Sequence, residues 1–480
     1  MSEAKPDDFD LIVIGGGPAG QKAAVQGAKL GKRVLLVERS RNVGGACVRF
    51  GTIPSKTLRE TALALGKFRR LTSHVMDVKM PEQTQIESLM TRKEEVIASH
   101  ESYMSAQLSR NGIEQSQGVA RFLTPHELEI TGISGTKRKV SGRFFVIATG
   151  SSPRTPDDVP VDHEHILDSD SLLSLSYLPE SLTVLGSGVI ACEYASIFAA
   201  LGTRVTVIDR SPRPLAFLDP EITDHFTRQL ELFGGRFLGG RKHTKIEWDG
   251  LSLVETTLDN GEVVKSEKLF CALGRLAQVQ GLGADVAGIG LTPRGLIAVD
   301  AHCRTASPHI YAVGDVIGPP ALASTSMDQG RRAVCHAFEV ELGVARDATP
   351  AGIFTIPELA SVGLTEAEVK ERHGGAQVGR ARFKEVARGQ ISAAEDGLLK
   401  LIAHPESGVI LGAHAAGETA ADLVHIGQMA ILGGMTFETF IDAIFNFPTY
   451  AESYRIAALD LLGQRAKRAA QAREAATAAE

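Results

Sequence analysis

The sequence lacks the long apolar runs and the excess of basic residues that mark several common protein classes. No stretch offers the roughly 18 consecutive apolar residues that a membrane-spanning helix needs, so we expect no membrane partner. The 51 Lys and Arg residues are outnumbered by 57 Asp and Glu residues, which leaves a net charge of −6. Without a large positive field, nucleic acid is not expected as a partner.

Closely spaced cysteines are also missing. The chain has 5 cysteines, an odd number, and no two of them lie closer than 32 positions. There is no CxxC motif and no zinc-ligand spacing, so we predict no metal site and a reducing, cytoplasmic location. Residues 1–10 carry four acidic side chains before the first apolar run, which is not typical of a cleavable signal peptide.

The composition is that of a soluble globular protein with several cores. Of the 480 residues, 43% are hydrophobic and 22% are charged, and a chain of this length is expected to form two to four domains. The 49 glycines are more than usual. They indicate backbone that must turn tightly or approach a ligand closely.

The first glycine-rich turn lies between two short apolar segments. Residues 9–14 and 33–38 read as buried strands, and a helix is expected from the turn to about residue 30. The turn itself contains Gly15, Gly17, Pro18, Ala19 and Gly20. In a dinucleotide-binding βαβ unit, the first glycine permits the turn, the second lets a pyrophosphate approach, and the third lets helix pack on strand. Glu38, at the end of the second strand, is placed to bind a ribose.

The same pattern returns about 170 residues later. Strands are expected at 182–185 and 204–209, with a helix to about residue 201. The turn between them contains Gly186, Gly188, Val189, Ile190 and Ala191. Asp209 suits the ribose of NAD, whereas Arg210 and Arg213 suit the 2′-phosphate of NADP. Because both signs of charge occur together, we predict a site that accepts both nucleotides.

Two such units suggest that one holds a flavin and the other a nicotinamide nucleotide. Elsewhere we expect a polar helix at about 85–112, strands from 118 to 150, a buried strand at 308–315 and a long helix from about 325. From about residue 352 the pattern predicts a separate α+β domain. The alanine-rich segment after Leu462 is expected to be a frayed helical tail without chemistry.

One further segment makes the resemblance to a known family specific. Residues 44–56, Gly-Gly-Ala-Cys-Val-Arg-Phe-Gly-Thr-Ile-Pro-Ser-Lys, resemble the redox-centre segment of the flavoprotein disulfide reductases, the class I pyridine nucleotide-disulfide oxidoreductases. Glutathione reductase and dihydrolipoamide dehydrogenase are members of that family. Other blocks match the family in its order, at 148–153, 272–275, 311–315 and 354–358, and the resemblance spans residues 10–462.

The resemblance implies an α/β fold with two Rossmann-like dinucleotide-binding domains, for FAD and NAD(P), and a C-terminal α+β dimerisation domain. The expected boundaries are 1–155 and 276–350 for the two parts of the FAD domain, 156–275 for the NAD(P) domain, 351–465 for the dimerisation domain and 466–480 for the tail. It also implies FAD as cofactor, NAD and NADP as substrates, and a homodimer or higher homo-oligomer.

The resemblance implies the site residues as well. Asp315 would hold the ribityl chain of FAD, and Lys56 would lie beside flavin N5, paired with Glu193. The candidate catalytic residues are Lys56, Glu193, Thr52 and Cys47. The candidate cofactor-binding residues are Gly15, Gly17, Pro18, Ala19, Gly20, Glu38, Gly45, Cys47, Lys56, Thr149, Gly150, Gly186, Gly188, Val189, Ile190, Glu193, Asp209, Arg210, Gly274, Gly314, Asp315, Leu322 and Ala323.

Two departures from the family pattern decide the expected function. Thr52 stands where disulfide-reducing members have the flavin-proximal cysteine, and Phe447 stands where they have an acid/base histidine. A threonine forms no disulfide and no thiolate, and a phenylalanine carries no proton. Cys47, without a partner thiol, is expected to be a retained, partly buried group rather than a nucleophile, and His425 is expected to be packed or capping.

The combination of Cys47, Thr52 and Phe447 resembles the soluble pyridine nucleotide transhydrogenase branch of the family. That implies hydride transfer from NADPH to flavin N5 and then to NAD⁺, with ping-pong kinetics. An NAD(P)H-dependent quinone or dye reductase is the alternative, followed by a dihydrolipoamide dehydrogenase-like enzyme and a non-catalytic nucleotide sensor. The direction of hydride transfer, the preference between NAD and NADP and the assembly beyond a dimer stay open.

Overall fold

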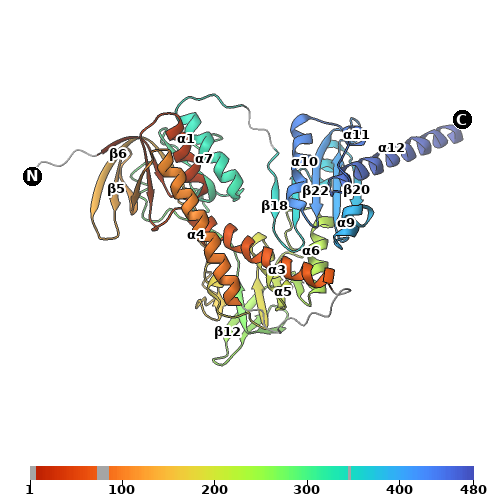
Figure 1. The fold of residues 1–480 in the computed structure, drawn as a ribbon, viewed down its shortest axis with the longest axis horizontal. Coiled ribbons are helices and arrows are strands. Elements are labelled where there is room, and N and C mark those ends of the chain that lie inside the picture. The colour runs from red at the N-terminus through yellow and green to blue at the C-terminus, as the bar shows by residue number, and fades with distance from the viewer. Residues whose placement is uncertain (1–6, 73–85, 344–347, 480) are drawn as a thin grey trace, which may run out of the picture.

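The structure is a computed structural model that describes residues 7–72, 86–343 and 348–479. Residues 1–6 of the acidic N-terminal segment lie outside this range. Within the described residues the strands form five sheets. Figure 1 shows three lobes: one with β6, α1 and α7, a second around β12 and α5, and a third, nearest the C-terminus, with α10, α11 and α12.

The first lobe is built on strand β1 (Asp7–Ile14), which pairs in parallel with β2 (Val34–Glu38) and β6 (Lys137–Ile147). Successive β1 side chains point to opposite faces, so that Val13 packs in one hydrophobic core and Ile12 in another. Because both faces are covered, the strand reads as a continuous apolar run. The expected strands at 9–14 and 33–38 are confirmed.

Strands from distant parts of the chain complete this sheet. Its order is β3-β2-β1-β6-β5-β4, with β17 pairing in parallel with β6. The added strands are β3 (Glu114–Gln117), β4 (Val119–Thr124), β5 (Glu127–Thr131) and β17 (Ile310–Ala312). Helices α1 (Pro18–Lys29) and α7 (Ala323–Ala337) pack so closely that a Cβ on Gly330 would lie 2.2 Å from the carbonyl oxygen of Ala19.

The second lobe repeats the pattern of the first. Strand β9 (Ser181–Leu185) pairs in parallel with β10 (Arg204–Asp209) and β15 (Lys268–Cys271), and helix α5 (Val189–Ala200) follows β9. The expected βαβ unit is therefore confirmed. The other elements are β8 (Ile166–Leu167), η1 (Ser171–Ser174), α6 (Pro220–Leu232), β11 (Arg236–Gly239), β12 (His243–Trp248), β13 (Val254–Leu258) and β14 (Val263–Ser266).

A short antiparallel ribbon marks where the chain leaves the first lobe and returns to it. Its strands are β7 (Ser151–Pro153) and β16 (Arg275–Ala277). Pro153 lies opposite Arg275 in the register, so two segments far apart in the sequence pair with each other.

The third lobe is an antiparallel sheet of order β18-β19-β22-β21-β20, covered by helices. Its elements are β18 (Ala351–Ile353), β19 (Leu359–Gly363), α8 (Glu366–His373), β20 (Gln377–Arg382), η3 (Phe383–Glu385), α9 (Ala387–Ile391), β21 (Leu398–Ala403), β22 (Ile410–Ala416), α10 (Ala420–Gly433), α11 (Glu438–Asp442) and α12 (Glu452–Ala479). The predicted α+β domain, and with it the predicted fold class, is confirmed. Helix α12 runs across residue 465 as one helix, as its alanine-rich composition favours, and the domain boundary expected there stays a prediction.

Three helices lie between the lobes. Helix α2 (Gly45–Arg49) leads into α3 (Thr52–Thr72), which Figure 1 shows running toward α5 and α6. Helix α4 (Ile86–Arg110) packs against α3 and confirms the helix expected at 85–112. Across the described part of the chain, we find no helix with the length and apolar character to span a membrane.

Candidate functional site

A cavity of about 1220 Å³ lies where the three lobes meet. Its wall includes both glycine turns, helices α2 and α3, the short helix η2 (Gly314–Ile317) and residues 349–354 of the third lobe. Pockets that hold a drug-sized ligand measure about 300–1,000 Å³. The cavity is therefore large enough for a dinucleotide and for part of a second ligand beside it.

The glycines of the two turns differ in why they are needed. Gly15 has a φ of +105°, and a Cβ on Gly20 would lie 1.9 Å from the Gly15 carbonyl oxygen, so the fold itself requires both. Gly17 and Gly188 have ordinary extended backbones, with φ of −71° and −76°, and each begins a helix on the cavity wall. A Cβ on Gly17 would meet only Gly45 at 3.9 Å, and one on Gly188 would meet nothing within 4 Å.

Glycine at 17 and 188 therefore has no explanation in the packing of the protein. A ligand that approaches the backbone there does explain it, since the N-terminus of each helix offers N–H groups and a positive dipole to a phosphate. Two buried hydroxyl groups on the same wall, of Thr149 and Tyr194, also have no hydrogen-bond partner among the described residues. Buried hydroxyl groups that lack a hydrogen-bond partner in the protein are typical of a ligand site. Both observations fit two nucleotide ligands.

Glu38 is fixed at the end of β2 with its carboxylate on the cavity. Its Oε2 accepts a hydrogen bond of 2.7 Å from the N–H of Gly16, and its Oε1 accepts one of 2.8 Å from the N–H of Ser40. These bonds hold the carboxylate beside the first glycine turn. Carboxylate oxygens at this position are suited to accept from ribose hydroxyl groups.

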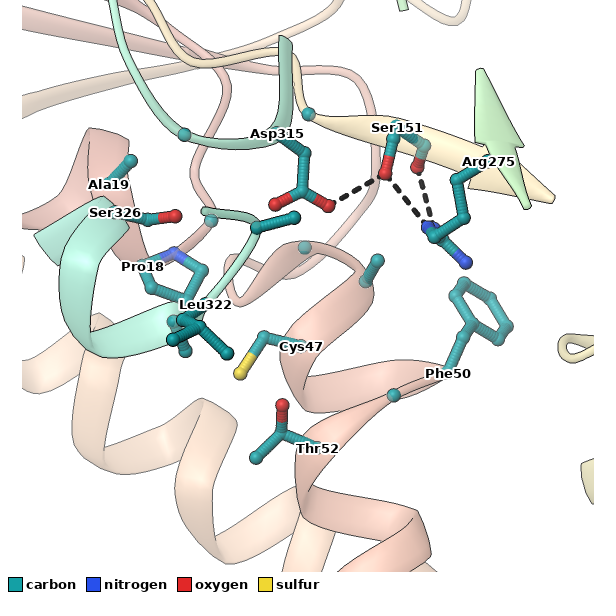
Figure 2. Close-up of a pocket in the computed structure, with 18 of the residues that line it drawn as sticks. Pro18, Ala19, Cys47, Phe50, Thr52, Ser151, Arg275, Asp315, Leu322 and Ser326 are labelled. Carbon is teal, nitrogen blue, oxygen red and sulfur yellow. Dashed lines mark hydrogen bonds between the residues drawn. The ribbon is translucent and has the colours of Figure 1, made fainter. Parts of the chain in front are cut away.

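Asp315 is held by a chain of polar groups that joins the two strands of the ribbon (Figure 2). The Ser151 hydroxyl donates to Asp315 Oδ2 at 2.7 Å, and Arg275 Nε donates to that hydroxyl at 2.8 Å. Arg275 Nη2 also donates to the Ser151 carbonyl oxygen at 2.8 Å. Ser151 and Arg275 were not among the predicted site residues, although both lie in motifs that matched the family.

Lys56 and Glu193 form an ion pair between helices α3 and α5. The distance from Lys56 Nζ to Glu193 Oε2 is 2.6 Å, and the side chains are 25% and 6% exposed. The other oxygen of Glu193 accepts from the N–H of Phe354 at 2.9 Å, and Lys56 Nζ lies 5.0 Å from the centre of the Phe354 ring. Through these contacts, Lys56, Glu193 and Phe354 join all three lobes on the cavity wall. Phe354 was not predicted as a site residue.

The side chains of Cys47 and Thr52 lie close together on the cavity wall (Figure 2). Burial raises the pKa of the Cys47 thiol above its ordinary value, and this outweighs the lowering effects of Thr52 and Lys56. The thiol is therefore protonated at neutral pH and a poor nucleophile. Its expected place as a partly buried group is confirmed.

Most of the predicted site residues line this one cavity. They are Gly15, Gly17, Pro18, Ala19, Glu38, Gly45, Cys47, Thr52, Lys56, Thr149, Gly150, Gly188, Val189, Ile190, Glu193, Gly274, Gly314, Asp315, Leu322 and Ala323. Gly20, Gly186, Asp209 and Arg210 lie outside the lining. The Asp209 carboxylate instead accepts from the N–H of Ser211 at 2.6 Å, so a role for Asp209 and Arg210 stays a prediction.

His425 is the residue that sequence reasoning placed wrongly. It was expected to be packed or capping, but it is exposed and lines the cavity, with Nδ1 2.9 Å from the side-chain oxygen of Gln428. The apolar run around it suggested burial, whereas the helix turns the His425 side chain outward. Phe50 and Phe217, which also line the cavity, gave no signal in the sequence.

Comparisons with known proteins agree with this architecture. Residues 9–330 match the family described as pyridine nucleotide-disulphide oxidoreductase, and residues 349–458 match the dimerisation domain of that family. A protein named soluble pyridine nucleotide transhydrogenase from Mycobacterium tuberculosis is 42% identical over 458 residues, 95% of this chain and 98% of its own. A protein of the same name from Hahella chejuensis is 39% identical over 460 residues, 95% of this chain and 98% of its own.

Solved structures are similar over the same length. LpdA from Mycobacterium tuberculosis superposes with a TM-score of 0.87 at 27% identity, covering 94% of this chain and 99% of that one. The HOCl-induced flavoprotein disulfide reductase RclA from Escherichia coli gives a TM-score of 0.85, with the same identity and coverage. With both family matches in order and these relatives matched over almost their full length, the chain belongs to the pyridine nucleotide-disulphide oxidoreductase family.

Proposed function

We propose that this protein is an FAD-dependent NAD(P)⁺ transhydrogenase, which moves hydride between NADPH and NAD⁺. The observation that carries the proposal is Thr52, which stands opposite Cys47 in a cavity that keeps both glycine turns and the pair of Lys56 and Glu193. The site can receive electrons from a nicotinamide but has no dithiol to pass them on. The relatives named soluble pyridine nucleotide transhydrogenases support this proposal.

FAD, when bound, supplies a ring that takes a hydride from one nicotinamide and returns it to another. Gly17 and Glu38 would hold its dinucleotide part, and Asp315 its ribityl chain. Lys56 and Glu193 place a fixed charge pair on the wall near the second turn, where Gly188 leaves room for the nicotinamide nucleotide. Because the second turn offers one nucleotide position, NADPH and NAD⁺ would use it in turn, which predicts ping-pong kinetics.

We further propose a homodimer that acts in the cytoplasm. The match to a dimerisation domain supports the dimer, as do Met429, Ile444 and Phe447, which are apolar and exposed on the third lobe. All five cysteines are free thiols, which supports a reducing compartment.

The proposal is tested by comparing electron acceptors at saturating NADPH. The purified protein is assayed with thio-NAD⁺, with a water-soluble quinone and with lipoamide or glutathione disulfide. We expect thio-NAD⁺ to be the fastest acceptor and the disulfides to give no turnover. A quinone that outpaces thio-NAD⁺ at every concentration would instead identify a quinone reductase, and rapid disulfide reduction would contradict the role given to Thr52.

We expect Cys47→Ala to keep transhydrogenase turnover within about twofold of the wild-type rate, because a thiol held in its protonated form neither attacks nor transfers electrons. Steady-state turnover and the flavin spectrum are the measurements. Cys303→Ala, which removes a part-buried thiol outside the cavity lining, is the control. A fall of more than about tenfold in Cys47→Ala alone would give this thiol a catalytic part.

A further inference from the structure

A cluster of charged side chains, buried at its centre, joins the third lobe to the start of helix α6 in the second lobe. At its centre, Lys400 of β21 is 2% exposed. Its Nζ lies 2.9 Å from Asp219 Oδ2, 2.6 Å from Glu221 Oε1 and 2.7 Å from Glu366 Oε2. A single ammonium group therefore contacts three carboxylates that come from two lobes.

The cationic side of the cluster is set by the register of three neighbouring strands. Arg380 on β20 lies opposite Lys400, and Lys400 lies opposite His414 on β22, so the three side chains share one face of the sheet. Arg380 donates to both oxygens of Glu221, at 2.7 and 2.6 Å. These bonds, together with those from Lys400, lower the pKa of Glu221 to about 2. Burial lowers the pKa of His414, so the two permanent cations carry the positive charge.

Asp219, one of the three carboxylates, is the last residue of a loop that borders the cavity. Residues 210–219, which we name the 210–219 loop, run from the end of β10 to the N-cap of α6. Asp219 is that N-cap and accepts from the N–H of Glu221 at 3.0 Å. Within the loop, the N–H of Leu215 donates to the carbonyl oxygen of Ser187 at 2.9 Å, and Phe217 lines the cavity. The loop thus contacts the second glycine turn through Leu215, and it contacts Lys400 through Asp219 at its end.

The three carboxylates do not depend on Lys400 equally. Glu221 keeps Arg380, and Glu366 keeps Lys370 at 2.6 Å. Asp219 is 1% exposed, and among the described residues Lys400 is its only ion-pair partner. A buried charge that loses its partner is strongly unfavourable, so removal of Lys400 would drive Asp219 toward solvent. The 210–219 loop would move with it.

We propose that Lys400 is a positioning residue for nicotinamide nucleotide binding: through Asp219 it fixes the 210–219 loop beside the second glycine turn. The inference rests on the proposed function only in that the second turn holds the nicotinamide nucleotide. It places a determinant of nucleotide affinity in the third lobe, on a strand that does not line the cavity.

The test measures equilibrium binding of NADP⁺ by calorimetry to the yellow holoenzyme, together with the limiting rate of flavin reduction at saturating NADPH. In Lys400→Met, we expect the Kd for NADP⁺ to rise by about tenfold or more, while flavin content and the limiting reduction rate stay within about twofold. A purely structural defect would instead lower both the flavin content and the limiting rate.

Two further variants make the result specific. Arg228→Met breaks another contact between α6 and the third lobe, with Asp396 at 3.2 Å, away from the 210–219 loop, and we expect it to leave the Kd unchanged. Asp219→Asn keeps an N-cap side chain but needs no cation, so Asp219→Asn in the Lys400→Met background is expected to recover part of the lost affinity.

Three outcomes would overturn the inference: an unchanged Kd in Lys400→Met, an equal rise in Arg228→Met, or no recovery in the double variant. Because NADP⁺ binding is measured without turnover, these outcomes are separate from a failure of the proposed function. That failure would appear in the wild-type protein, as flavin that NADPH reduces but NAD⁺ does not reoxidise.

Discussion

Replacing Glu193 by glutamine will slow reduction of the bound flavin by NADPH by about a hundredfold, a loss of the size found when one preorganised hydrogen-bond donor is removed from an active site. Glutamine fills the same space and still accepts the N–H of Phe354, which bonds Glu193 Oε1 at 2.9 Å. With that bond kept, the amide NH2 of glutamine faces Lys56, so the variant loses both the negative charge and the acceptor that hold Lys56 Nζ at 2.6 Å. The change therefore acts on the position and environment of the ammonium group and leaves the packing intact.

The measurement is anaerobic stopped-flow absorbance of the flavin after mixing with NADPH, with thermal unfolding as a check on folding. Glu129→Gln is a matched control, because Glu129 pairs with Lys137 at 2.9 Å on β5 and lies outside the cavity lining. Lys56→Met is expected to slow reduction likewise and also to lower the unfolding midpoint, since it leaves the nearly buried Glu193 carboxylate without its cation. Reduction of Glu193→Gln at the wild-type rate would show that the pair has no part in the reaction.

Alanine at Gly17 and alanine at Gly188 will weaken the binding of different ligands. A Cβ at either position meets no protein atom closer than 3.9 Å, and neither glycine has a positive φ, so both variants should fold. The added methyl group occupies the space that a pyrophosphate needs beside the helix N-terminus. We expect Gly17→Ala to be purified nearly colourless, and Gly188→Ala to be yellow but with a Kd for NADPH raised by about tenfold or more.

For Gly17→Ala the measurement is flavin content per chain. For Gly188→Ala it is the Kd for NADPH, obtained by titrating NADPH into the protein with its flavin reduced. Gly66→Ala on α3 is the matched control, because a Cβ there also meets nothing within 4 Å and the residue lies outside the cavity lining. It should keep both functions and gain slight stability from the higher helix propensity of alanine. Loss of flavin in Gly188→Ala would reverse the assignment of the two turns. Full flavin content in Gly17→Ala would contradict the assignment of the first turn to the flavin.

The local parts of the fold could be predicted because they depend on neighbours in the sequence. The strands before each glycine turn, the helices after them and the position of Glu38 follow from apolar runs and glycine spacing. The contact of Lys56 with Glu193 required the family resemblance, because the two residues are 137 positions apart. Nothing in the periodicity of either helix indicates that they meet.

Other parts of the site could not be predicted, because they arise only when distant elements meet. The bond from Ser151 to Asp315 joins residues 164 positions apart. The ion pair of Lys400 with Asp219 joins positions 181 apart, and Lys400 read alone is a polar residue in a strand. His425 was misjudged because an apolar helical run does not show which of its side chains turns toward a cavity.

The most direct test of the account is a sequential-mixing stopped-flow experiment on the wild-type protein under anaerobic conditions. NADPH first reduces the flavin, and the reduced protein is then mixed with NAD⁺ or, in a parallel run, with a quinone. The account predicts rapid reduction followed by rapid reoxidation by NAD⁺, at a rate no slower than steady-state turnover. Flavin that NADPH reduces but NAD⁺ leaves reduced, while the quinone reoxidises it quickly, would contradict the transhydrogenase assignment and identify a different electron acceptor.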